Sequence, residues 1–83
     1  MSRKVSLAEQ KKIKSIITYW INNGCWDTGI YAAACLGAVF GINITHSKFI
    51  SIDYMLRAAR ATGYTYPDEL SEKIINKINE LEE

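Results

Sequence analysis

One uncharged stretch constrains the fold of this chain more than any other feature. Gly29–Ile44, GIYAAACLGAVFGINI, lies within a run from Thr28 to Ser47 that contains no Asp, Glu, Lys or Arg. A helix on a protein surface normally has one polar face, so a helix formed here must be covered on most sides. The stretch of about sixteen residues is shorter than the ~20 residues that cross a bilayer. We therefore expect a central helix of a non-membrane domain.

Capping signals and hydrophobic periodicity predict helices at residues 7–22, 28–40, 46–62 and 67–81. The signals are a capping box from Ser6 and Glu9, N-caps at Asp27 or Thr28 and at Thr45 or Ser47, Gly63 after the third helix, and Pro67 in the first turn of the fourth. The short loops predict antiparallel neighbours. We expect one domain, 1–83, with an all-α fold: a compact four-helix domain with the helix at about 28–40 at its centre.

Apolar side chains at helical spacing predict the core. The expected buried stripes are Ile13, Ile16, Ile17 and Trp20; Phe49, Ile52, Met55, Leu56 and Ala59; and Leu70, Ile74, Ile78 and Leu81. In the 28–40 helix, the face with Ala32, Cys35, Leu36, Val39 and Phe40 should fill the core. Trp26 is expected to join Trp20 in the interior.

The opposite face of the 28–40 helix carries small residues, among them Ala33, Gly37 and Gly41. Small residues at this spacing allow another backbone to approach closely. We expect this small face to pack on another helix of the same chain. Self-association through Ala33, Gly37 and Gly41 is the alternative, and would make the protein a homodimer or a structural homo-oligomer subunit.

Charge is distributed unevenly although the formal net charge is only +1. Residues 1–60 hold eight basic and three acidic side chains, whereas residues 61–83 hold two basic and six acidic ones. We expect the two chain ends to attract each other or simply to be solvated. The alternative is a basic surface that binds a partner.

The sequence lacks the usual parts of a catalytic or metal site. His46 is the only histidine, and neither Cys25 nor Cys35 stands at a close ligand spacing from it. No glycine-rich phosphate loop follows a strand pattern. We predict no enzymatic activity and no metal or cofactor. Two thiols in apolar surroundings, with no apolar leader after Arg3 and Lys4, predict a cytoplasmic protein.

The leading functional hypothesis is a small interaction module that binds a partner protein, acting as an inhibitor, adaptor or regulator of the kind typical of phages and mobile elements. Tyr and Arg often anchor protein interfaces. The predicted partner-binding residues are Ile50, Asp53, Tyr54, Arg57 and Arg60.

A helix-turn-helix-like DNA-binding regulator is the weaker alternative. Its nucleic-acid contacts would be Arg3, Lys4, Lys11, Lys14 and Lys48. The register is poor, because taking Gly41 as the turn glycine places Ser47 where the recognition helix normally has an apolar anchor.

Overall fold

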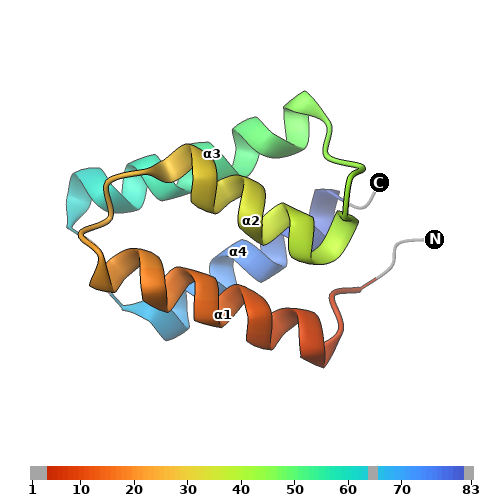
Figure 1. Ribbon diagram of the computed structural model, residues 1–83, viewed down its shortest axis with the longest axis horizontal. Coiled ribbons are helices and arrows are strands. Elements are labelled where there is room, and N and C mark those ends of the chain that lie inside the picture. The colour runs from red at the N-terminus through yellow and green to blue at the C-terminus, as the bar shows by residue number, and fades with distance from the viewer. Residues whose placement is uncertain (1–3, 64–65, 82–83) are drawn as a thin grey trace.

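The chain folds into an antiparallel helical bundle. The computed structural model describes residues 4–63 and 66–81, and over these ranges α1 spans Leu7–Asn22, α2 Thr28–Phe40, α3 His46–Thr62 and α4 Pro67–Leu81. Consecutive helices run in opposite directions (Figure 1). α1 packs against α2 and α4, and α3 packs against the same two helices. The predicted all-α, four-helix fold is confirmed, and the helices occupy the expected ranges.

The helix boundaries are fixed by side-chain caps, because the first amides of a helix lack partners within it. Ser6 Oγ accepts from the Glu9 amide at 3.1 Å, and Glu9 Oε1 accepts from the Ser6 amide at 2.9 Å, which completes the capping box. Of the alternatives at the next two helices, Asp27 caps α2 and Thr45 caps α3. Gly63, in the left-handed conformation, ends α3.

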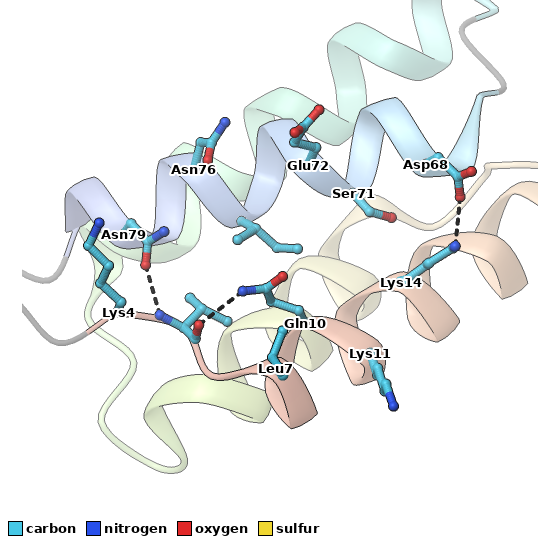
Figure 2. A pocket seen from close by; sticks show the side chains of 12 residues that line it. Lys4, Leu7, Gln10, Lys11, Lys14, Asp68, Ser71, Glu72, Asn76 and Asn79 are labelled. Carbon is cyan, nitrogen blue, oxygen red and sulfur yellow. Dashed lines mark hydrogen bonds and ion pairs between the residues drawn. The ribbon is translucent and has the colours of Figure 1, made fainter.

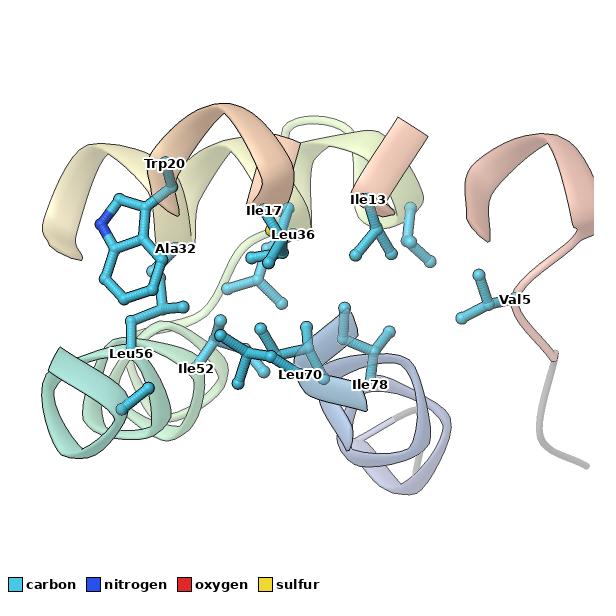
Figure 3. Close-up of a cluster of buried hydrophobic side chains, with 14 residues drawn as sticks. Val5, Ile13, Ile17, Trp20, Ala32, Leu36, Ile52, Leu56, Leu70 and Ile78 are labelled. Atoms are coloured by element: carbon cyan, nitrogen blue, oxygen red, sulfur yellow. The ribbon is translucent and has the colours of Figure 1, made fainter. Parts of the chain in front are cut away.

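A single apolar core lies between the α1–α2 layer and the α3–α4 layer (Figure 3). Every predicted stripe contributes fully buried residues to it, among which Trp20 is the largest. The ends of the stripes, such as Ile16 on α1 and Leu81 on α4, are only partly buried. The periodicity therefore identified the inward direction of α1, α3 and α4.

α2 lies between α1 and α3 and makes the most extensive contacts of the four helices. Its large face is buried as expected, through Ala32, Cys35, Leu36 and Val39, with Phe40 half-buried. Among the described residues, no helix is both long and apolar enough to cross a membrane.

The expectation that the small face of α2 packs on a neighbouring helix is wrong. A Cβ atom built on Gly37 meets no other heavy atom within 4 Å, and Ala34 and Gly41 are exposed. The physical reason is that α2 packs on both neighbours through its large face and the flanks of that face. The small residues leave an uncharged strip on the molecule, in which Ala33 and Gly37 are half-buried and Ala34 and Gly41 are exposed.

Two glycines on this strip should respond oppositely to alanine. Gly37 lies inside α2 with open space around it, so Gly37→Ala should stabilise the protein by about 1 kcal/mol and raise its thermal midpoint by about 4–8 °C. Gly41 also has open space but adopts φ +62°, ψ −124°, which an L-residue rarely accepts. Gly41→Ala should therefore destabilise by at least about 1 kcal/mol. Thermal unfolding by circular dichroism checks both, and destabilisation by Gly37→Ala would contradict the open position of Gly37.

Candidate functional site

The surface formed by α2, α3 and the loop before α2 exposes several large apolar side chains. We call this surface the α2–α3 face, and it comprises Trp26, Ile30, Ile50, Asp53, Tyr54, Arg57 and Arg60. Trp26 and Tyr54 each keep 71% of their surface exposed. Ile30 and Ile50 are also exposed. Exposed single apolar residues are ordinary, but this many large ones beside arginines have the composition of an interface.

The prediction that the side chain of Trp26 lies in the core is wrong, because this side chain is exposed. Trp26 precedes the Asp27 cap, so it lies outside the helix and off the buried stripe of α2. Its carbonyl oxygen accepts a hydrogen bond of 2.9 Å from Arg60 Nη1 on α3. This bond ties the loop before α2 to α3 and brings the backbone of Trp26 beside Arg60, one of the predicted partner-binding residues. The signal available in the sequence was the position of Trp26 directly before a helix cap.

Ile50, Tyr54 and Arg57 share the outer side of α3, as their i, i+4, i+7 spacing predicts. Asp53 was also expected to contact a partner, but only 14% of its side chain is exposed. It lies toward α2, where its Oδ2 atom accepts from Arg57 Nε at 2.7 Å. Asp53 is therefore placed to orient Arg57 rather than to meet a partner directly.

The electrostatics of Asp53 follow from this position. Desolvation raises the pKa of its carboxyl, but the Thr28 hydroxyl, the hydrogen bond and charge of Arg57, and the charge of Arg60 outweigh it, so the pKa is lowered from the ordinary 3.8. Its Oδ1 atom is buried and makes no hydrogen bond of good geometry to the described residues. The ionised carboxylate thus depends on its two arginine neighbours.

Two of the lysines proposed for nucleic acid make contacts within the protein. Lys14 Nζ lies 2.9 Å from Asp68 Oδ1 on α4, and Lys48 Nζ lies 4.1 Å above the centre of the Phe40 ring. Lys4 and Lys11 line the same groove as Lys14, between α1 and α4, together with acidic side chains. Arg3 lies outside the described residues. The Lys14–Asp68 pair agrees with the expectation that the basic and acidic parts of the chain attract each other.

Both cysteine thiols are free, and the pKa of each is raised. Burial raises the pKa of Cys35 to about 12, so this thiol stays protonated at neutral pH. Desolvation also raises the pKa of Cys25. Over residues 4–63 and 66–81, no three His, Cys, Asp or Glu side chains are grouped so as to hold a metal ion.

No protein-family model matches the chain, and neither a curated protein nor a solved structure shows significant similarity to it.

Asp53 should contribute to the acid sensitivity of the fold. Because its pKa is lower in the folded than in the unfolded chain, its stabilisation is complete above the unfolded value and is lost as the pH falls through the folded value. Asp53→Asn should therefore lower stability at neutral pH and reduce the loss of stability on acidification below pH 3.8. Urea unfolding across this range measures both effects.

Asp68→Asn is the matched control, because its partner Lys14 is 58% exposed and an ion pair this accessible contributes only about 0–1 kcal/mol. An acid response that is the same in Asp53→Asn and the unmodified protein would contradict the assigned role of Asp53.

Proposed function

We propose that this protein is a small, non-enzymatic interaction module that binds a partner protein through the α2–α3 face. The observation that carries the proposal is the exposure of Trp26, Ile30 and Tyr54 on elements that pack together, beside two arginines held in place by hydrogen bonds. Tryptophan, tyrosine and arginine provide most of the binding energy in many protein interfaces. An inhibitor, adaptor or regulator that acts by covering a partner's surface needs such a binding surface and no catalytic group.

The hydrogen bonds that hold Arg57 and Arg60 within the protein also support this proposal. Arg57 is oriented by Asp53, and Arg60 is oriented by the Trp26 carbonyl. Part of the side-chain entropy that an interface must remove is therefore lost already when the protein folds. The same bonds reduce the freedom of both guanidinium groups to follow a phosphate backbone, which favours a protein partner over the DNA-binding alternative.

Removing the aromatic anchors should abolish partner binding without unfolding the protein. We expect the double variant Trp26→Ala, Tyr54→Ala to keep its thermal midpoint within a few degrees, because both side chains are largely exposed. Affinity capture from cells of the source, after nuclease treatment and with quantitative mass spectrometry, should show at least a tenfold loss of one or more specific proteins.

Tyr66→Ala is the matched control for this experiment. Tyr66 is 64% exposed but precedes α4 rather than belonging to the α2–α3 face. Its variant should capture the same proteins as the unmodified chain. If the double variant retains every captured protein, or if capture depends on nucleic acid, then the proposed function is wrong.

The partly exposed small face of α2 favours a second candidate, a homo-oligomer whose copies meet through Ala33, Gly37 and Gly41. A neutral surface can pair with its own copy about a two-fold axis without opposing like charges. This candidate predicts sedimentation at about twice 9.4 kDa for the unmodified chain and at 9.4 kDa for Gly37→Arg. A monomeric mass for the unmodified chain at its highest soluble concentration would contradict it.

A further inference from the structure

The exposed charge around the α2–α3 face has a single sign. The charged residues in the segment 23–63, which contains α2 and α3, are Asp27, Lys48, Asp53, Arg57 and Arg60. Both carboxylates are half-buried and bonded within the protein, since Asp27 Oδ1 accepts a backbone amide of α2 at 3.2 Å and Asp53 Oδ2 accepts from Arg57 Nε at 2.7 Å. Within this segment only the two arginines are largely exposed, so the charge offered to a partner is positive.

The other side of the molecule differs, because lysines and carboxylates lie together there. In the α1–α4 groove, Lys14 Nζ lies 2.9 Å from Asp68 Oδ1, and Lys11 and Glu72 belong to the same lining (Figure 2). A partner of either sign would meet like as well as opposite charges in this groove. The single sign of charge is therefore a property of the α2–α3 face.

Both arginines keep donors for a ligand. A guanidinium group has five N–H donors in a planar fork. Arg57 gives its Nε–H to Asp53 and makes no other hydrogen bond within the described part of the chain, so its two Nη groups remain available. Arg60 gives one Nη1–H to the carbonyl of Trp26, a neutral group that leaves the charge of Arg60 uncancelled. Each arginine can thus bind a carboxylate through two parallel N–H groups.

The local charge balance favours an acidic partner. Asp53, Arg57 and Arg60 carry one negative and two positive charges, a net charge of +1. Arg57 follows Tyr54 by three residues on the same side of α3, so a partner that packs on this tyrosine also lies beside Arg57. Covering a positive charge without compensation is unfavourable, and a basic partner would add repulsion. A carboxylate at this place offsets the cost.

The apolar part of the face narrows the class of partner further. Ile50 precedes Tyr54 by four residues, and the two side chains are 49% and 71% exposed. From Ile50 to Arg57 this side of α3 measures roughly 10 Å at 1.5 Å per residue. A nucleic acid could satisfy the arginines through its phosphates but offers no aliphatic side chain to Ile50. A short protein segment can supply a carboxylate and an apolar side chain over this distance.

We propose that the α2–α3 face selects an acidic and apolar segment of its partner protein. An Asp or Glu carboxylate of this segment binds between Arg57 and Arg60, and a neighbouring apolar side chain packs on Tyr54 and Ile50. Asp53 acts as a positioning residue that holds Arg57 in place. The inference rests on the proposed function, because it names the chemistry of the partner at the same surface.

A displayed library of random dodecapeptides tests the inference without knowledge of the partner. The library is panned against the unmodified protein, and peptides that also bind the double variant Trp26→Ala, Tyr54→Ala are discarded. We expect the remaining peptides to be enriched at least about twofold in Asp and Glu, close to aromatic or aliphatic residues, relative to the unselected library. Absence of this enrichment, or of any peptide that requires Trp26 and Tyr54, overturns the inference. The capture experiment decides the proposed function separately.

Neutralising changes on both sides then locate the contact. One enriched peptide and its form with Glu→Gln or Asp→Asn are titrated against the unmodified protein, Arg57→Gln and Arg60→Gln. Glutamine retains N–H donors for Asp53 and for the Trp26 carbonyl, so circular dichroism should show both variants folded. We expect the neutral peptide to bind the unmodified protein about three- to tenfold more weakly, and this loss to shrink in at least one arginine variant.

Lys11→Gln is the matched control, because it removes an exposed positive charge from the α1–α4 groove instead. The full loss on neutralising the peptide should persist in this variant. If the loss is also undiminished in both arginine variants, the inference is wrong. Binding of a random-sequence DNA duplex at physiological salt that requires Tyr54 and Arg57 would overturn it as well.

Discussion

The burial of Trp20 is the interaction on which the bundle most depends. Its side chain points from α1 into the core, toward the layer that contains Leu56, and is completely buried (Figure 3). Its indole N–H has no hydrogen-bond partner among the described residues, which costs about 1–3 kcal/mol. Burying ~200 Å² of largely apolar ring surface contributes about 5 kcal/mol. The apolar term therefore exceeds the polar penalty, and the indole can close the core at one end of α1.

At the other end of α1, the two ends of the described chain are joined by burial and hydrogen bonds more than by charge. The Lys14–Asp68 pair is the visible result of the uneven charge distribution, but it is exposed and contributes at most about 1 kcal/mol. Val5, by contrast, is buried and bonded through its amide to Asn79 on α4. The apolar side chain and the hydrogen bonds of its backbone therefore hold the N-terminal segment.

Sequence reasoning placed the helices well because each has a local signal. The Ser6–Glu9 box and the caps at Asp27 and Thr45 act within one turn, so no knowledge of the tertiary fold is needed. Inward stripes were equally clear on α1, α3 and α4, where polar residues mark the outer side.

The wrong predictions concern positions that lack such local signals. α2 carries no charge, so its sequence showed that the large face is buried but could not show whether a second helix also covers the small face, which is open around Gly37. Asp53 and Trp26 were misplaced for a related reason. Periodicity gives a direction relative to one helix axis, whereas their positions depend on how α2 and α3 pack together. The α1–α4 groove was not foreseen at all, because it joins residues far apart in the chain.

The order in which the helices pack also sets the positions of the α2–α3 face and of the groove between α1 and α4. Each helix packs on two neighbours, so the contact between α2 and α3 lies opposite the contact between α4 and α1. The α2–α3 face and the α1–α4 groove share no helix. A partner bound on the α2–α3 face would not cover the groove, and a rigid core would keep the two at a fixed separation.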